Sequence, residues 1–317
     1  MLNVKIAAKR KVAEDICTFE LVSEDGRKLP QFTAGSHIDV HVPGEYVRQY
    51  SLCNSTQETH RYLIGVLKDP VSRGGSIAMH QLEEGARLRV SEPKNHFPLE
   101  DSMEHSILVA GGIGITPIIS MADKLTESGR SFELHYCVRT RNKAAFMEEL
   151  TRERFCSAVR LHVDDEPDQK FDAEWIFKHA PGATPHVYVC GPSGFIQHVL
   201  DSARGAGYAE AQLHREYFGA NPKKDDSADK SFEVHIASTG LRCLVGADES
   251  VVAALARHGI EIPTSCEQGV CGTCVTRVAA GVPLHRDLYL TDEERAANDQ
   301  FTPCCSRSSS PVLVLDI

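Results

Sequence analysis

Five cysteines are concentrated in the last fifth of the 317-residue chain, and three of them are closely spaced. The run Cys266-Glu-Gln-Gly-Val-Cys271-Gly-Thr-Cys274 has the spacing C-x4-C-x2-C, and Cys304 follows after 29 intervening residues. Three thiolates from one tight loop and a fourth from elsewhere match the ligand spacing of a plant-type [2Fe–2S] cluster. The C-terminal part of the chain is therefore expected to fold around such a cluster, with Cys266, Cys271, Cys274 and Cys304 as its ligands.

Two glycines in this loop support the interpretation. Gly269 and Gly272 can adopt positive φ angles, which lets the loop curl and point backbone N–H groups at the sulfides. The fourth ligand has a neighbour, Cys305, and in an extended segment adjacent side chains face opposite sides. We choose Cys304 by its spacing. A structural zinc site is the alternative, but zinc sites favour paired C-x2-C knuckles.

The chain divides into three stretches of different character. Residues 1–101 contain short alternating segments between turn residues, which is typical of an antiparallel β-barrel or sandwich. Residues 102–224 alternate buried strands with helices, expected near 143–152, 172–179 and 193–205, so we predict an α/β domain with a parallel sheet. A polar linker leads into residues 225–317, where a β-hairpin, an amphipathic helix and a final strand predict an α+β domain.

A glycine-rich turn follows the first buried strand of the α/β domain. Gly111, Gly112 and Gly114 lie in AGGIGITP, and Thr116 and Pro117 open the helix that follows. Such glycines let the backbone approach a pyrophosphate, and the helix N-terminus supplies N–H donors. The run is not the G-x-G-x-x-G fingerprint of dehydrogenases. Close packing of helix against strand is the alternative reading.

A second tight turn makes a nucleotide site more credible. Cys190, Gly191 and Pro192 end the strand VYVCGP, and ligands of parallel sheets sit at the carboxyl ends of strands. We expect Cys190 to face the reacting ring and, together with Thr116, to shape the catalytic pocket. The alternative for Cys190 is a small buried residue.

The first domain carries residues that suit a flavin. Arg48, Gln49, Tyr50 and Ser51 end a strand and supply a cation, a hydroxyl and an aromatic wall. Downstream, the turn that contains Arg73, Gly74, Gly75 and Ser76 precedes a short helix and is a candidate phosphate cradle. Read alone, the first of these segments is simply a strand with an arginine.

Composition excludes other classes of function. The formal charge is −10 and no basic stripe is evident, so nucleic acid is not an expected partner. No apolar stretch is long enough to span a bilayer, and the N-terminus lacks the apolar region of a signal peptide. We therefore expect a cytoplasmic protein that acts as a monomer, with neither membrane nor nucleic-acid partner.

The motifs together resemble one family over nearly the whole chain. The segments RQYSLCN, RGGS, PKNHFPL, AGGIGITP, YVCGP, YFGA, CEQGVCGTC and CCSR are similar to those of phthalate dioxygenase reductases and vanillate demethylase reductases. The resemblance implies an FMN β-barrel, an NAD domain and a β-grasp ferredoxin domain, with NADH as donor and a Rieske-type aromatic-ring oxygenase as acceptor. It adds three flavin contacts at Gly65, Val66 and Leu67, where a relative has a basic residue in place of Leu67, and an aromatic one at Phe218. It also assigns Gly74, Gly75 and Ser76 to the phosphate.

The expected activity is electron transfer from a two-electron donor to a one-electron acceptor through a flavin. The alternatives are a FAD-dependent reductase for another acceptor, such as a cytochrome P450, and a redox-sensing iron–sulfur protein. NADH is favoured over NADPH because Asp164 and Asp165 end one strand, although Arg139 and Arg141 end another and could accept a 2′-phosphate.

Overall fold

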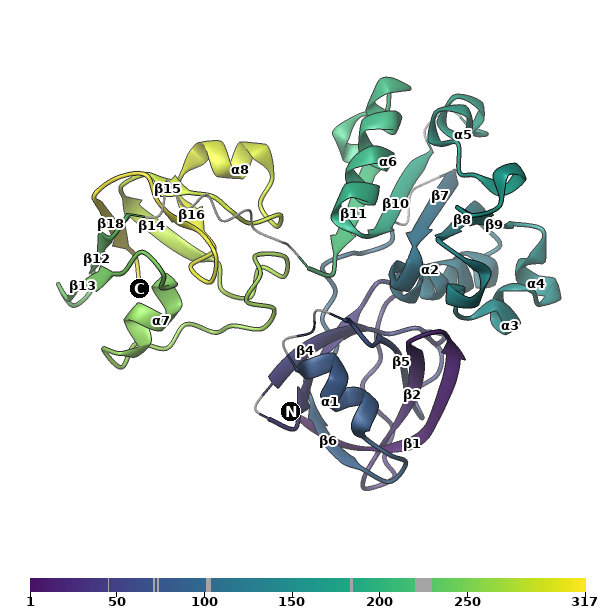
Figure 1. The fold of residues 1–317 in the computed structure, drawn as a ribbon, viewed down its shortest axis with the longest axis horizontal. Coiled ribbons are helices and arrows are strands. Elements are labelled where there is room, and N and C mark those ends of the chain that lie inside the picture. Colours follow the sequence, from purple (N-terminus) through teal and green to yellow (C-terminus); the bar gives the residue numbers. More distant parts are fainter. Residues whose placement is uncertain (45, 71, 73, 101–103, 183–184, 220–229) are drawn as a thin grey trace. The chain divides into compact units, whose positions relative to one another are not determined.

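The computed structural model describes residues 1–317 except 45, 71, 73, 101–103, 183–184 and 220–229 (Figure 1). The chain forms two compact units, Met1–Phe218 and Gly219–Ile317. The expected domain boundaries at 101/102 and 224/225 lie outside the described residues, as do Arg73 and nearly all of the polar linker.

The first unit begins with an antiparallel sheet in the order β4-β3-β6-β1-β2-β5. An isolated bridge between Leu52 and Ile64 joins the end of β4 to β5, so the sheet curls into a barrel. Alternating apolar residues such as Phe19 and Leu21 fill its interior because successive side chains of a strand face opposite sides. The elements are β1 (Leu2–Ala13), β2 (Ile16–Ser23), β3 (His37–Val42), β4 (Tyr46–Ser51), β5 (Tyr62–Leu67), α1 (Gly75–Gln81) and β6 (Arg87–Val90).

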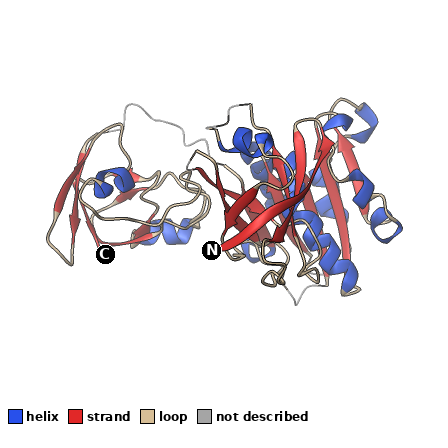
Figure 2. Cartoon of the chain, turned by 90° about the horizontal axis from the view of Figure 1, so that it is seen from below, coloured by secondary structure: helices blue, strands red, loops and turns tan. Residues whose placement is uncertain are grey.

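The same unit continues as a five-stranded parallel sheet in the order β11-β10-β7-β8-β9. Leu108 and Ala110 pack with α2 on one face, whereas Ile107 and Val109 pack with α5 and α6 on the other, so helices cover both faces (Figure 2). The strands are β7 (His105–Gly111), β8 (Ser131–Val138), β9 (Val159–Val163), β10 (His186–Gly191) and β11 (Leu213–Tyr217). The helices are η1 (Gly112–Gly114), α2 (Ile115–Glu127), η2 (Arg141–Lys143), α3 (Met147–Leu150), α4 (Glu153–Cys156), η3 (Pro167–Gln169), α5 (Ala173–His179), α6 (Ser193–Gly205) and η4 (Glu210–Gln212).

The helix predicted near 143–152 is wrong in extent. Within it only α3 is α-helical, because Phe146 before α3 adopts a left-handed conformation with φ of 59° and Arg152 after it is extended. The Phe146 ring is 2 % exposed and lies against β5, where a Cβ on Gly65 would come within 3.2 Å of it. Burial of this aromatic ring outweighs the helical preference of its neighbours.

The second unit is built on a mixed sheet in the order β13-β12-β18-β14-β16, with α7 packed on its apolar face. β12 and β13 form the predicted antiparallel hairpin, and the final strand β18 inserts parallel to β12. The elements are β12 (Phe232–Ile236), β13 (Arg242–Val245), α7 (Val251–Ala256), β14 (Thr276–Ala280), β15 (Pro283–Leu284), α8 (Asp292–Ala297), β16 (Gln300–Phe301), β17 (Arg307–Ser308) and β18 (Val312–Leu315).

Candidate functional site

Both predicted glycine turns follow strands at the point where the strand order of the parallel sheet reverses. β7 and β10 are neighbours, but β7 leads to β8 on one side and β10 leads to β11 on the other. The connections after these two strands therefore diverge at their carboxyl ends, which is where ligands bind in open α/β sheets. The structure thus brings the turn at Gly111–Gly114 next to the turn at Gly191.

Close packing explains three of the glycines and not the fourth. A Cβ on Gly114 would lie 2.2 Å from the Cys190 carbonyl oxygen, and one on Gly191 would lie 3.0 Å from the Gly111 Cα. A Cβ on Gly111 itself would lie 2.8 Å from the ring of Phe195. Gly112 has a φ of +55° and nothing within 4 Å of its Cβ position, so conformation alone selects glycine there. Gly112 leaves the space in which a ligand can approach the backbone.

The start of α2 combines a continuous backbone turn with a packed side chain. No side chain caps this helix, and η1 runs directly into it, so that the Ile115 N–H donates to the Gly112 carbonyl. Thr116 is 1 % exposed and its hydroxyl donates to the Ile113 carbonyl over 3.0 Å. Its methyl group faces β5, where a Cβ on Gly65 would come within 2.8 Å. Pro117 lies in the first turn, where a missing N–H costs nothing.

Three side chains from distant segments converge beside the second turn. Cys190 lies opposite Glu216 in the register of β10 and β11, and the Ser51 hydroxyl at the end of β4 donates to Glu216 Oε2 over 3.4 Å. Burial raises the pKa of the Cys190 thiol well above its usual value and raises the pKa of the Glu216 carboxyl to about 8. Both groups are therefore mainly uncharged at neutral pH.

Sequence reasoning missed Glu216. The signal was available in part, because LHREY is the strand that follows VYVCGP and a carboxylate in a five-residue strand of a covered sheet is unusual. Its pairing with Cys190 depends on register, and its contact with Ser51 joins residues 165 positions apart.

The candidate phosphate site joins β4 to the start of α1. The Arg48 guanidinium lies 5.2 Å from the centre of the Tyr46 ring, and a Cβ on Gly75 would come within 2.6 Å of Arg48 Nε. Gly74 has a φ of 103° and lies against the Tyr46 hydroxyl, so only glycine fits. The Ser76 hydroxyl accepts the Asp69 backbone N–H over 3.2 Å. A fixed cation thus lies beside uncapped backbone N–H groups, which suits a phosphate.

The side chains of β4 alternate between two surroundings. Gln49 donates to Asp39 Oδ1 over 3.1 Å and lies 3.2 Å from His37 Nε2, so its amide is occupied by β3. Tyr50 packs against the barrel core on the side of Arg48, and burial raises the pKa of its hydroxyl. The Gln49 side-chain amide is therefore held by β3, and Arg48, Gln49, Tyr50 and Ser51 all stay predicted flavin contacts.

The remaining predicted flavin contacts lie on β5 and after β11. Gly65 packs against Thr116, Val66 is fully buried, and Leu67 is half-buried against the core shared with α2. The His80 ring lies 3.0 Å from the Val66 carbonyl, which ties β5 to α1. Phe218 is 42 % exposed. The barrel therefore presents β5 to the nucleotide domain through a glycine, which permits close approach of the two backbones.

The four predicted cluster ligands form two thiol pairs in the second unit. The Cys266 thiol hydrogen-bonds to Cys271 and lowers the pKa of Cys271 to about 5, and a hydrogen bond from Cys304 lowers the pKa of Cys274. Cys271 and Cys274 are buried, and the other two are half-buried. Two pairs suit a cluster in which four cysteines are shared between two irons.

The backbone of the cysteine loop leaves no room for other residues at its glycines. Gly269 and Gly272 both have a φ of +71°, as predicted. A Cβ on Gly269 would lie 2.4 Å from Cys305 Sγ, and one on Gly272 would lie 2.2 Å from the Tyr289 ring. Cys305 packs against the loop at Gly269, 3.3 Å from the Thr302 hydroxyl. The Cys304 thiol hydrogen-bonds both to Cys274 and to Cys305, and Cys304 stays the predicted fourth ligand.

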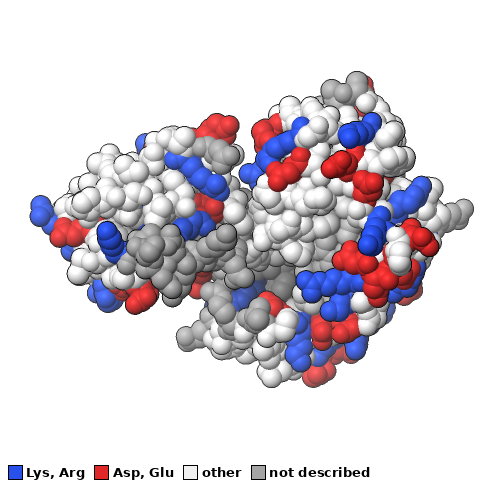
Figure 3. Space-filling view, turned by 45° about the horizontal axis from the view of Figure 1, so that its top comes forward, with Lys and Arg blue, Asp and Glu red and all other residues white. Residues whose placement is uncertain are grey.

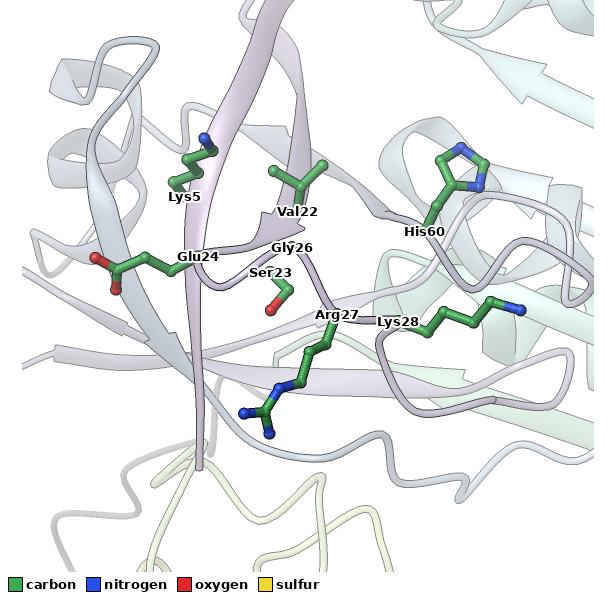
Figure 4. Close-up of a pocket in the computed structure, with 8 residues that line it drawn as sticks. All are labelled: Lys5, Val22, Ser23, Glu24, Gly26, Arg27, Lys28 and His60. Atoms are coloured by element: carbon green, nitrogen blue, oxygen red, sulfur yellow. The ribbon is translucent and has the colours of Figure 1, made fainter.

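Other surface features do not coincide with these residues. A groove of about 260 Å³ is lined by β1, β2 and the loops beside them, and its side chains, which include Lys5, Arg27, Lys28 and His60, belong to no predicted site (Figure 4). On the face drawn in Figure 3, acidic and basic side chains are interspersed over the first unit. Among the described residues, no helix is both long and apolar enough to cross a bilayer.

Comparison with known proteins agrees with a nucleotide site in the first unit and a cluster site in the second. Residues 108–201 match the oxidoreductase NAD-binding domain, and residues 234–309 match the 2Fe-2S iron-sulfur cluster binding domain. Vanillate O-demethylase oxidoreductase of Pseudomonas putida is 53 % identical over the full length of both chains. The solved structure of phthalate dioxygenase reductase is 40 % identical, with a TM-score of 0.78 over 100 % of this chain and 98 % of that one.

A further solved structure shows the same three parts inside a larger protein. An intact type IV self-sufficient cytochrome P450 monooxygenase is 37 % identical, with a TM-score of 0.85 over 100 % of this chain and 41 % of that one. The glycine turns at the switch point, the paired thiols and these full-length similarities together have one explanation. The chain belongs to the family of NADH-dependent iron–sulfur oxidoreductases that includes vanillate O-demethylase oxidoreductase and phthalate dioxygenase reductase.

Proposed function

We propose that this protein takes electrons from NADH through FMN to its [2Fe–2S] cluster and delivers them to a Rieske-type oxygenase that acts on an aromatic substrate. The observation that carries the proposal is the convergence of Ser51, Cys190 and Glu216, which brings the flavin strand β4 to the crevice at the sheet's switch point. A flavin, when bound, supplies the conversion between a two-electron donor and a one-electron acceptor. The chain has to hold the two rings together, because hydride transfer depends on close approach.

The residues divide this work as follows. Arg48, Gly74, Gly75 and Ser76 bind the flavin phosphate, Tyr50 and Ser51 with the β5 segment Gly65–Leu67 border its ring, and Phe218 lies at its edge. Gly111, Gly112, Gly114 and Pro117 shape the pyrophosphate turn, and Gly191 and Pro192 the opposing one. In this scheme Thr116 and Cys190 line the catalytic pocket without exchanging protons, which agrees with the satisfied Thr116 hydroxyl and the raised pKa of the Cys190 thiol. Cys266, Cys271, Cys274 and Cys304 hold the cluster.

The proposal includes the division into an FMN domain at 1–101, an NAD domain at 102–224 and a ferredoxin domain at 225–317. We further propose that the protein acts as a monomer in the cytoplasm. The oxygenase partner is supported by the names of the relatives, which describe demethylation of vanillate and dioxygenation of phthalate.

A cytochrome P450 is the second candidate acceptor. One observation favours it: a P450 monooxygenase contains a module similar to this whole chain. Mixing the reduced protein separately with an oxygenase from the vanillate system and with a P450, and following oxidation of the cluster at its visible absorbance, distinguishes the two.

Replacing one ligand tests the electron path. In Cys304→Ser we expect NADH-dependent reduction of cytochrome c to fall by at least about a hundredfold while reduction of ferricyanide by the flavin is retained, since loss of a ligand disrupts the cluster alone. Cys243→Ser is the matched control, because Cys243 is buried in the same unit among apolar residues away from the loop. If Cys304→Ser keeps both activities and its iron, the ligand assignment is wrong.

A further inference from the structure

Two charged segments lie side by side at the carboxyl ends of β8 and β9 (Figure 1). Arg139 and Arg141 follow β8, and Asp164, Asp165 and Glu166 follow β9. The strand pairing extends into these segments, because the Asp164 N–H donates to the Val138 carbonyl over 3.0 Å and the Asp165 N–H to the Arg139 carbonyl over 3.3 Å. The positions of these charges are therefore set by the sheet.

The end of β8 is where an adenosine ribose is expected. In doubly wound sheets the pyrophosphate lies at the turn after the first strand, and the ribose reaches the end of the next strand. An acidic residue there binds the ribose hydroxyls, whereas a nearby arginine accommodates the 2′-phosphate of NADPH. β8 is paired directly with β7, so that Gly111 lies opposite Cys137. The charges after β8 and β9 are thus placed to distinguish the two nucleotides.

One of the two arginines is already engaged. Arg141 Nε lies 2.6 Å from Glu166 Oε1, and Arg141 Nη2 lies 2.7 Å from Glu166 Oε2. This bidentate pair occupies the planar edge of the guanidinium, which is the edge that would otherwise bind a phosphate. Counting the five charged residues gives two positive and three negative groups, a formal charge of −1. A phosphate dianion that approaches Arg141 would meet an occupied guanidinium within a cluster of net negative charge, and Arg139 is the arginine outside this pair.

We propose that Glu166 is a specificity-determining residue, which selects NADH over NADPH by holding Arg141 in a bidentate pair. This inference rests on the proposed function, since it requires a nicotinamide nucleotide at the turn after β7. It goes further by assigning the discrimination to one ion pair. Glu166 acts on the nucleotide through Arg141, by occupying its guanidinium.

Glu166→Gln removes the charge and one acceptor with little change in shape. We measure kcat/KM for NADH and for NADPH with ferricyanide as acceptor, because that assay reads flavin reduction and needs neither the cluster nor an oxygenase. We expect kcat/KM for NADPH to rise about tenfold and that for NADH to change less than about twofold, the scale of one charge-assisted contact. In the double variant Arg141→Gln/Glu166→Gln the gain should disappear.

The chain offers a matched control in a second bidentate pair. Arg204 Nε and Nη2 lie 2.5 and 3.1 Å from the two oxygens of Glu210, at the end of α6 that lies away from the switch point. Glu210→Gln should leave both nucleotides unaffected. If Glu166→Gln does not exceed this control, or if its gain survives removal of Arg141, the proposal is refuted while NADH oxidation itself stands. If the unaltered holoprotein does not oxidise NADH, the proposed function fails as well.

Discussion

Replacing Glu216 with Gln tests the surroundings of Cys190, the predicted nicotinamide contact, through the pH dependence of stability. Burial raises the pKa of Glu216 from 4.5 to about 8. Between these values the folded protein keeps a proton that the unfolded chain has lost, so the stability of the native protein falls as pH rises. Glutamine cannot ionise, so the stability of the variant does not fall with pH for this reason.

The size of the effect follows from the shift. A change of about 3.5 pKa units corresponds to about 5 kcal/mol at about 1.4 kcal/mol per unit. Because the Glu216 side chain is only partly enclosed, solvent screening reduces this, and we expect about 2–3 kcal/mol. For a unit of this size that is a difference in Tm of about 5–10 °C. The Tm of Glu216→Gln minus that of the unaltered protein should grow by this amount between pH 5 and pH 9.

The assay is thermal unfolding of the flavin-loaded protein, followed by circular dichroism at several pH values. Glu210→Gln is a control of opposite sign, because the Arg204 hydrogen bond lowers the pKa of Glu210 and its contribution to stability is complete above the usual pKa of the carboxyl. Its difference in Tm should stay constant from pH 5 to pH 9. A difference for Glu216→Gln that is equally constant would refute the assignment of a half-buried carboxyl that stays protonated beside Cys190.

Three further substitutions test the packing and charge of the site. Gly114→Ala places a Cβ 2.2 Å from the Cys190 carbonyl oxygen, and we expect it to cost about 1–3 kcal/mol of stability in thermal unfolding and to abolish NADH-dependent reduction of ferricyanide. Arg48→Gln should weaken FMN binding by about ten- to a hundredfold in fluorescence titrations of the flavin-free protein, since it removes a charge-assisted phosphate contact. Gly272→Ala meets the Tyr289 ring at 2.2 Å with φ at +71°, and should lower the iron and acid-labile sulfide content while FMN content is unchanged.

Matched glycines provide the controls. Gly194 has nothing within 4 Å of its Cβ position, and Gly246 meets only Glu249 at 3.7 Å, so alanine at either position should retain activity and cofactor content. If Gly194→Ala is as damaging as Gly114→Ala, or Gly246→Ala as damaging as Gly272→Ala, steric conflict is not the reason. For Arg48, unchanged FMN affinity in the glutamine variant would contradict the phosphate assignment.

The sequence by itself determined the features that depend on local spacing. Cluster ligands repeat every few residues because one loop must surround two irons, so Cys266, Cys271 and Cys274 are recognisable without the fold. The positive φ of Gly269 and Gly272 is also local, and the order of strands and helices follows from the period of the hydrophobic pattern. The family resemblance rests on the same local segments and therefore gives no information on contacts between them.

Tertiary structure decided everything that depends on register or on contacts between distant segments. Glu216 lies beside Cys190 because β11 pairs with β10, and its carboxylate meets Ser51 from a segment 165 positions away, and neither contact is encoded in local spacing. The partner of the Gln49 side chain, Asp39 on β3, also follows from strand pairing and not from local spacing. Phe146 ended a predicted helix because burial against β5 outweighs helical preference. The local sequence pattern indicates which chemical groups the chain contains. Packing determines which side chains come into contact, because the free energy of burial depends on pairs of surfaces that are brought together only in the folded chain.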